Sequence, residues 1–342
     1  MTYLGIDYHK KDSFVTALDE NGKKLFHGRL PSQTDAFKAI LRTLPAPFKA
    51  VIEASRTWQV MYEILEELGV PTEVAHAMRV RAIAEVQIKT DARDSEILAY
   101  LLKANLIPKI HVPQKKTRLL RILVRQRLYL VQTRTRLKNR VHHLLDRNRI
   151  PNPGHSDLFC GAGLKYIKTV ALLDTERLCL ERMLAHLDFL QSQVKELDAL
   201  IQKKIGSLPE AKLLESLPGV GGVFSALMAL EIDSIERFQD AAHLASYAGL
   251  VPRTYASGDY SHQGSLVTGS NHFLKWAFLE AAWSATNKSA YCRHYFEKIK
   301  KRLGSKSAIV ALARRLVQIA YSILKEKRLY EERPFRAAFV AV

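Results

Sequence analysis

The first thirty residues alternate apolar and polar side chains with a period of two, which is the spacing of β-strands. This alternation predicts strands over residues 3–7, 13–19 and 24–30. Glu20-Asn21-Gly22 has the composition of a tight turn and would join the last two strands as a hairpin. A three-stranded meander is therefore predicted to open the fold.

Helical and strand patterns alternate after the meander. Apolar positions three or four apart predict helices over 37–44, 60–68 and 79–102, the last with an interruption at Lys89-Thr90-Asp91. Short apolar runs predict buried strands over 48–53 and 70–75. Strands followed by alternating helices and strands indicate an α/β domain, which we place at residues 1–108.

The chain becomes strongly basic after this domain. Residues 115–150 carry twelve lysines and arginines against one acid, Asp146, and apolar residues recur between them at helical spacing. A run of charge on a helix is ordinarily a solvated face, but solvated helices usually mix both signs. The near absence of acids favours contact with nucleic-acid phosphates, with these candidates: Arg118, Arg121, Arg125, Arg136 and Arg140.

A loop over 151–163 precedes a second long helix. Its apolar residues are spaced alternately three and four apart from Leu180 to Ile201, which is a heptad pattern. The pattern predicts a coiled coil or a helical hairpin with the basic helix, and the partner helix could belong to the same chain or to another subunit. These helices form the predicted middle region, residues 109–207.

From residue 208 to 325 the pattern is one of short helices separated by glycine-containing loops. Leu217-Pro218-Gly219-Val220-Gly221 precedes a helical stretch and resembles a helix-hairpin-helix turn. In such a turn Gly219 and Gly221 would let backbone amides approach a DNA phosphate. A tight turn between packed helices explains the glycines about as well. We place a mainly helical domain at 208–330 and a tail at 331–342.

The net charge of the chain is +18 and its pI is about 9.8, so nucleic acid is the first candidate partner and an acidic membrane surface the second. Three scattered cysteines exclude a disulfide framework and a zinc ribbon. An export leader and a membrane-spanning apolar run are not evident in the sequence, so a cytoplasmic protein is expected.

Four carboxylates stand where an active site could form. Asp7 and Glu53 each end a predicted strand, and Asp91 and Asp94 are three residues apart at the start of a helix, on one of its faces. A ribonuclease-H-like fold brings such residues together, and hard oxygen ligands suit Mg²⁺ or Mn²⁺. Salt bridges to nearby basic residues would explain the positions of Asp91 and Asp94 individually, but they do not explain why all four acids stand at such positions.

Ser257 lies in a second conspicuous segment, Gly249-Leu250-Val251-Pro252-Arg253 followed by Ser257-Gly258. A serine before glycine is by default a turn residue, and a Ser-His-Asp triad is not evident from spacing. Arg253 is a candidate phosphate clamp or, alternatively, a partner in a loop salt bridge.

Several motifs occur in an order that covers nearly the whole chain: Gly5-Ile6-Asp7, Glu53-Ala54-Ser55, Lys89-Thr90-Asp91-Ala92-Arg93-Asp94, Leu217-Pro218-Gly219-Val220-Gly221 and Gly249-Leu250-Val251-Pro252-Arg253 with Ser257-Gly258. In this order the chain resembles the insertion-sequence transposases of the one-ten type, the DEDD recombinases guided by a bridge RNA. The resemblance implies a RuvC-like domain with an acidic tetrad of Asp7, Glu53, Asp91 and Asp94, a dimerising coiled coil and a serine transposase domain.

The resemblance further implies that Ser257 attacks a DNA phosphate with metal assistance and forms a covalent intermediate, in a dimer of dimers whose sites combine two subunits. A structured guide RNA and donor and target DNA would be the partners, in a prokaryotic cytosol and near the nucleoid. The chain departs from the family pattern at Asp259-Tyr260 and at Thr268-Gly269-Ser270-Asn271, where basic residues are usual. The small residue that precedes the nucleophile is alanine here, Ala256, so Ser257 is the only serine at this site.

The expected function is therefore that of an RNA-guided DNA recombinase that moves its insertion element. Two alternatives remain open at this point. One is a RuvC-like structure-specific nuclease that uses water, and the other is a non-catalytic scaffold that binds nucleic acid.

Overall fold

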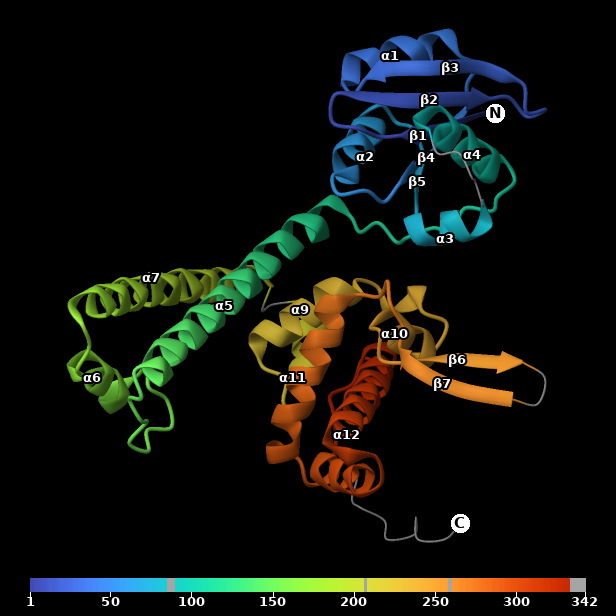
Figure 1. The fold of residues 1–342 in the computed structure, drawn as a ribbon. Coiled ribbons are helices and arrows are strands. Elements are labelled where there is room, and N and C mark those ends of the chain that lie inside the picture. Colours follow the sequence, from blue (N-terminus) through green and yellow to red (C-terminus); the bar gives the residue numbers. More distant parts are fainter. Residues whose placement is uncertain (85–89, 206–207, 258–259, 333–342) are drawn as a thin grey trace, which may run out of the picture. The chain divides into compact units, whose positions relative to one another are not determined.

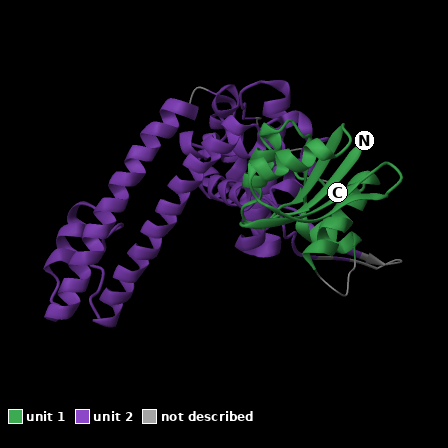
Figure 2. Ribbon diagram, turned by 90° about the horizontal axis from the view of Figure 1, so that it is seen from above, with its two compact units in different colours: residues 1–113 green, residues 114–342 purple. Residues whose placement is uncertain are grey.

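A computed structural model describes four stretches of the chain, residues 1–84, 90–205, 208–257 and 260–332 (Figure 1). The chain divides into two compact units, residues 1–113 and 114–342 (Figure 2). The first unit is mixed α/β and the second is mainly helical, in agreement with the two fold classes expected. The division of the second unit into a middle region and a C-terminal domain stays a prediction.

The first unit is built on a five-stranded sheet with the order β3-β2-β1-β4-β5. Its strands are β1 (Thr2–Asp7), β2 (Asp12–Leu18), β3 (Lys24–Pro31), β4 (Phe48–Glu53) and β5 (Thr72–Ala75). β1, β2 and β3 pair antiparallel, and β4 is parallel to both β1 and β5. The predicted meander and both predicted buried strands are confirmed, and the arrangement is consistent with a ribonuclease-H-like domain.

Helices cover both faces of this sheet. α1 (Thr34–Thr43) and α2 (Trp58–Glu67) pack on one face, while α3 (Ala77–Ile83) and α4 (Asp91–Lys103) contribute to the apolar cluster on the other. Two helices thus stand where one interrupted helix was expected. Residues 85–89, which include Lys89 of the expected interruption, lie outside the described residues.

Strand alternation decides which side chains of β1 face α4. Leu4 and Ile6 belong to the apolar cluster beneath α1 and α2, so Gly5 and Asp7 point to the α4 face. A Cβ on Gly5 would lie 2.0 Å from the carbonyl oxygen of Ser95 and 2.4 Å from the amide nitrogen of Ala99. The helix backbone therefore lies directly on the strand, and this contact requires glycine.

Gly5→Ala is expected to destabilise the first unit by about 2 kcal/mol or more, because the added methyl group would collide with backbone that cannot rotate away. Gly28→Ala on β3 is the matched control, since its Cβ would meet only the ring end of Phe26 at 3.3 Å. Urea denaturation of the two variants checks the expectation. Equal midpoints would contradict a close packing of α4 on β1.

The second unit begins with two long helices, α5 (Lys115–Arg147) and α7 (Asp174–Ile205), as predicted. They pack side by side in the same chain (Figures 1 and 2), so the hairpin alternative is confirmed, whereas a coiled coil with another subunit stays a prediction. A short helix, α6 (Gly161–Thr169), begins inside the segment that was expected to be a loop.

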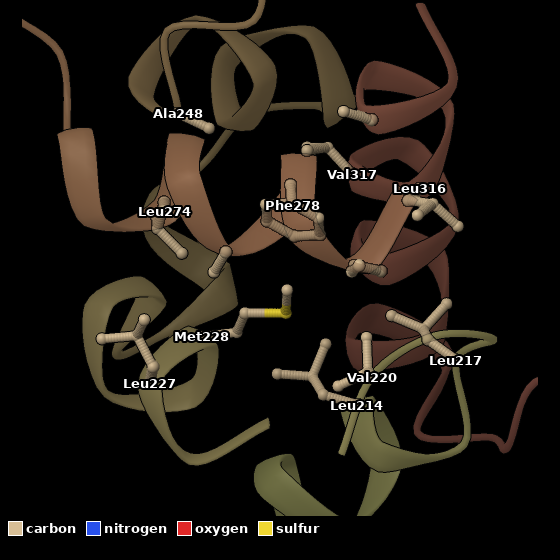
Figure 3. Packing of buried hydrophobic residues seen from close by; sticks show 14 of the residues in the cluster. Leu214, Leu217, Val220, Leu227, Met228, Ala248, Leu274, Phe278, Leu316 and Val317 are labelled. Atoms are coloured by element: carbon tan, nitrogen blue, oxygen red, sulfur yellow. The ribbon is translucent and has the colours of Figure 1, made fainter. Parts of the chain in front are cut away.

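The remaining helices form one apolar core with the adjoining ends of α5 and α7. Figure 3 shows part of this core. The helices are α8 (Pro209–Glu215), α9 (Gly222–Ile232), α10 (Ala241–Tyr247), α11 (His272–Lys288) and α12 (Ala290–Glu326), with a 3₁₀ turn, η1, at Ile235–Arg237. A kink at Gly304, whose torsion angles are non-helical, divides α12 into two helical segments. This agrees with the expectation of helices broken at glycines, although the second segment is longer than the short helices expected up to residue 325. A two-stranded hairpin, β6 (Pro252–Ser257) and β7 (Tyr260–Leu266), was also missed.

α12 is, within the described stretches, the one helix long and apolar enough to cross a membrane. Half of its most apolar window is buried inside the protein. Ala308, Leu312, Leu316 and Ala320 are among its fully buried residues. The apolar character of this helix is accounted for by its place in the core.

Candidate functional site

Asp7 and Glu53 are the last residues of neighbouring parallel strands. The register pairs Gly5 with Val51 and Ile6 with Ile52, so its continuation brings Asp7 beside Glu53. Alternation also puts both carboxylates on the face that carries α4. Both side chains are partly exposed, as expected for residues at the rim of a sheet.

The first turn of α4 supplies the other two acids, Asp91 and Asp94. Its N-cap is Thr90, whose hydroxyl accepts a hydrogen bond from the amide of Arg93. Acidic residues are favourable in a first turn because they face the positive end of the helix dipole. A buried hydrogen bond of 2.8 Å between Thr16 Oγ1 and Ser95 Oγ joins this turn to β2.

Asp7, His9 and Asp91 bring ligand atoms within 4.8 Å of one another. His9 Nε2 lies 3.2 Å from Asp7 Oδ2 and 3.6 Å from Asp91 Oδ1. Arg29 of β3 donates a hydrogen bond of 3.0 Å from Nη2 to Asp91 Oδ2. Two of the four predicted acids therefore form a compact cluster with a histidine, next to a cavity of about 250 Å³ lined by His9, Arg29 and Asp91.

The environment of Asp7 disfavours its ionised form. Burial raises the pKa of the Asp7 carboxyl most strongly, and the negative charges of Asp91 and Asp94 raise it further, while His9 acts in the opposite direction. Asp94 is thus electrostatically coupled to Asp7, although it is not a member of the compact cluster. Glu53 also has an interaction partner.

The donor set fits a divalent cation. Carboxylate oxygens lie close together at one edge of the sheet. The pKa of Asp7 is raised first by burial and then by the charges of Asp91 and Asp94, and a bound cation would favour the ionised carboxylate. Asp7, Asp91 and His9 are the residues that could hold one. His9 was missed in the sequence because it follows the strand rather than ending it, although the spacing Asp-x-His at a strand end was available as a signal.

Ser257 ends β6, and the strand register pairs it with Tyr260 of β7. The predicted turn nucleophile therefore stands at the far end of a two-stranded hairpin. Residues 258 and 259, which include the Asp259 departure from the family pattern, lie outside the described residues. The roles predicted for Ser257 and for the acidic tetrad remain predictions.

Arg253 lies near the base of the same hairpin. Its Nη2 donates a hydrogen bond of 2.7 Å to the hydroxyl of Thr268, one of the positions at which the chain departs from the family pattern. The guanidinium therefore takes part in a loop contact, although with a hydroxyl rather than a carboxylate. Its use as a phosphate clamp is not tested by this contact.

The glycine-rich turn packs against α11. Gly219 has φ +82°, and a Cβ there would lie 2.2 Å from the carbonyl oxygen of Ala281. This glycine is needed for the close approach of two backbone segments, which agrees with the packed-turn alternative. Gly221 is the N-cap of α9 and has open space around its Cα. Contact of either glycine with DNA stays a prediction.

The five arginines proposed for nucleic-acid binding fall into two groups. Arg136 and Arg140 are exposed on the part of α5 that lies beyond the core. Arg118, Arg121 and Arg125 are partly buried, and the last two bond to the end of α9. Burial lowers the pKa of the Arg121 guanidinium, an effect that Glu231 opposes. Arg121 and Arg125 are therefore engaged inside the protein, a role that the sequence analysis did not foresee.

Two family profiles match the chain. A transposase profile, that of the DEDD domain of the IS110 type, matches residues 4–149. A second profile, described as transposase of the IS116/IS110/IS902 family, matches residues 211–297. The first spans the acidic cluster and the basic helix, and the second spans the glycine-rich turn and the β6–β7 hairpin.

Similar curated proteins cover nearly the whole chain. An insertion element IS110 uncharacterized 43.6 kDa protein from Streptomyces coelicolor is 24% identical over 97% of this chain and 96% of its own length. The transposase for insertion sequence element IS1111A from Coxiella burnetii is 22% identical over 96% and 90%. The pilin gene-inverting protein of Moraxella bovis is 29% identical over 41% of this chain and 46% of its own length. This protein is accordingly a transposase, similar over nearly its whole length to insertion-element proteins of the IS110/IS116 type, and its match to the DEDD-type domain lies in residues 4–149.

Proposed function

We propose that this transposase is an RNA-guided DNA recombinase that exchanges strands through a phosphoserine intermediate. The observation that carries the proposal is the cluster of Asp7, His9 and Asp91 beside Asp94, in a chain whose family acts in transposition. The similarity of 41% of the chain to a pilin gene-inverting protein supports recombination rather than simple cutting. A DNA-acting enzyme of this kind is expected in the cytoplasm, near the nucleoid.

The acidic tetrad, Asp7, Glu53, Asp91 and Asp94, would hold Mg²⁺ or Mn²⁺, with His9 as an added ligand. A bound cation would neutralise the carboxylates and polarise the scissile phosphate. β1 and β4 fix two of the acids, and α4 fixes the other two. Arg29, which binds Asp91, could orient that carboxylate or contact the DNA phosphate itself.

Ser257 would provide the nucleophile. Its hydroxyl loses a proton as the oxygen forms a bond to phosphorus. The bond from that phosphorus to the leaving strand breaks, and the leaving oxygen takes up a proton. The hydroxyl of a new strand later attacks the same phosphorus, which releases the serine and joins the strands. The number of phosphodiester bonds is conserved, so rejoining requires no ATP.

RNA would bind the exposed, distal part of α5, where Arg136 and Arg140 face solvent. Folded RNA is recognised largely through shape and phosphate, which suits a helix face rich in arginine. Arg136→Gln with Arg140→Gln is expected to weaken RNA binding and to reduce the slope of log K against log salt by about 1.5. Filter binding at several salt concentrations measures this slope.

A control for that experiment removes two positive charges elsewhere. Lys298→Gln with Lys301→Gln alters exposed residues of α12 and should leave the slope within error of the unchanged protein. An unchanged slope in the arginine variant would show that RNA binds to another part of the protein than the distal part of α5.

The α5–α7 hairpin would also mediate self-association. Large apolar side chains are exposed along both helices: Leu119, Ile122, Tyr129, Leu178, Phe189 and Leu200. The three on α7 are eleven residues apart, which places them on one face of the helix. An exposed apolar row of this kind supports a homodimer through the hairpin, and a dimer of dimers would combine the tetrad of one subunit with Ser257 of another.

Mass spectrometry of the reaction tests the proposed function directly. The protein would be incubated with its guide RNA, donor and target DNA and Mg²⁺, then denatured and digested with protease and nuclease. The expected product is a peptide that spans Ser257 and carries a nucleotide. Cut DNA without any such peptide would indicate a nuclease that uses water, and intact DNA would indicate a non-catalytic scaffold.

A further inference from the structure

Glu231, near the C-terminal end of α9, is a fully buried carboxylate with a side chain only 1% exposed. Arg125 of α5 binds it twice, from Nε to Oε1 at 2.8 Å and from Nη2 to Oε2 at 3.0 Å. Arg121 Nε donates to the carbonyl oxygen of the preceding Leu230 at 2.8 Å. Burying a charge is costly unless it is paired and hydrogen-bonded, so an acid in an otherwise apolar helix requires these partners.

The same carboxylate binds Asn271. Asn271 Nδ2 donates to Glu231 Oε2 at 2.9 Å, and the side-chain oxygen of Asn271 accepts hydrogen bonds from the amides of Phe273 and Leu274. The Asn271 side chain therefore caps α11 with one end and binds Glu231 with the other. This connects three helices, α5, α9 and α11, through a single buried group.

Asn271 also binds the segment that leads into the β6–β7 hairpin. The backbone nitrogen of Asn271 donates to the carbonyl oxygen of Tyr247 at 2.8 Å, and its side-chain Nδ2 donates to the Tyr247 hydroxyl at 3.2 Å. Val267 N donates to Val251 O at 3.0 Å and closes the base of the hairpin. Tyr247 and Asn271 thus clamp the chain just before and just after the hairpin that carries Ser257.

The backbone at this clamp is tightly packed. Gly249 has φ +69°, and a Cβ there would lie 2.1 Å from Ser270 Oγ. β6 extends from Pro252 to Ser257, which is about 16 Å at the rise of a strand. A rotation of about 5° at the base would move Ser257 by more than 1 Å at this length. The orientation of the base therefore controls the position of the serine.

We propose that Glu231 is a positioning residue for Ser257, which it fixes relative to the basic helix by binding Asn271 on one side and Arg125 on the other. The inference rests on the proposed role of Ser257 as nucleophile. Glu231 is buried and does not touch DNA in this role. Its contribution is to the rate of attack rather than to the affinity for nucleic acid, since a displacement of 1 Å can cost on the order of a hundredfold in rate.

The test exchanges the two groups at the Glu231–Asn271 contact. Glu231→Gln removes the charge that Arg125 binds, and Asn271→Asp places a second carboxylate against Glu231, so each change disturbs the clamp. The double variant restores one carboxylate and one amide, and aspartate still caps α11. Each single variant is expected to slow adduct formation by about tenfold to a hundredfold. The double variant regains the contact at position 271 but not the charge pair with Arg125, so it should react faster than either single variant without reaching the rate of the unchanged protein.

Rates are measured at saturating DNA and RNA, well below each melting temperature, together with the Kd for RNA. A positioning role lowers the rate constant and leaves the Kd unchanged, whereas a purely structural role lowers only the melting temperature. Arg127→Gln is the matched control, because Arg127 makes a similar pair with Asp198 between α5 and α7, at 2.8 and 3.3 Å, without contacting the clamp. It should react at the normal rate.

Failure of this inference is distinguishable from failure of the proposed function. An adduct that survives Ser257→Ala would overturn the role of the serine. An adduct lost in Ser257→Ala but formed at the normal rate by both clamp variants would overturn the role of Glu231. If Glu231→Gln does not fold, Tyr247→Phe tests the inference instead, because it removes only the hydroxyl that lies beside Asn271. This variant should slow adduct formation by about threefold to tenfold. A normal rate of adduct formation by Tyr247→Phe would overturn the inference.

Discussion

Ser257→Ala is expected to abolish the covalent protein–DNA adduct and all strand exchange, while RNA and DNA still bind. Removing the nucleophile oxygen leaves no group to hold the phosphate between cleavage and rejoining, so the residual reaction should fall by about a millionfold. Denaturing gels with end-labelled DNA measure the adduct at single-turnover concentrations. The melting temperature should change little, because Ser257 ends a strand at the far end of a hairpin.

Ser265→Ala is the matched control for this experiment. Ser265 lies on β7 of the same hairpin and is exposed, so the control removes the same atom from the same element. It should form adduct at the normal rate. Normal adduct formation by Ser257→Ala, with the nucleotide on another residue, would assign the nucleophile elsewhere.

Asp7→Asn is expected to reduce DNA cleavage by about a thousandfold or more, since a metal that stabilises the reacting phosphate contributes several kcal/mol and each 1.36 kcal/mol is a factor of ten. The amide keeps the size of the side chain but cannot supply the charge that a divalent cation requires. Mn²⁺ titration followed by electron paramagnetic resonance should show the loss of binding without any DNA present.

Asp35→Asn is the control for that substitution. Asp35 is exposed in the first turn of α1, in the same unit as Asp7, and lies outside the proposed site. Its Mn²⁺ affinity and cleavage rate should both be normal.

Asp7→Asn is expected to raise the stability of the first unit, because burial already disfavours the charged form of Asp7. Normal Mn²⁺ binding by Asp7→Asn would show that the Asp7 carboxylate is not a ligand of the metal.

The N-terminal acids could be located from the sequence because each is tied to an element that the apolar pattern predicts. Asp7 and Glu53 end two strands with strong apolar character, and parallel pairing of those strands sets the acids side by side. Asp91 and Asp94 open a helix. What the pattern could not supply was the close approach of α4 at Gly5, which depends on packing between segments ninety residues apart.

The β6–β7 hairpin escaped prediction because its sequence does not alternate apolar and polar residues clearly. Arg253-Thr254-Tyr255 lacks a consistent apolar face, and a two-stranded ribbon outside the core needs none. The inward role of Arg121 and Arg125 was missed for another reason. Their partner, Glu231, is more than a hundred residues away, and the one available signal was a single acid in an apolar helix.

The α5–α7 hairpin contains two separate apolar clusters. Val124, Leu128 and Ile201 near its base belong to the main core, whereas Leu137, Val141 and other residues near α6 form a cluster of their own. The separate clusters predict that the distal half opens and closes without unfolding the core, as an independent cooperative unit. Its amide hydrogens should exchange with solvent faster than those at the base, and RNA bound to Arg136 and Arg140 would slow that exchange.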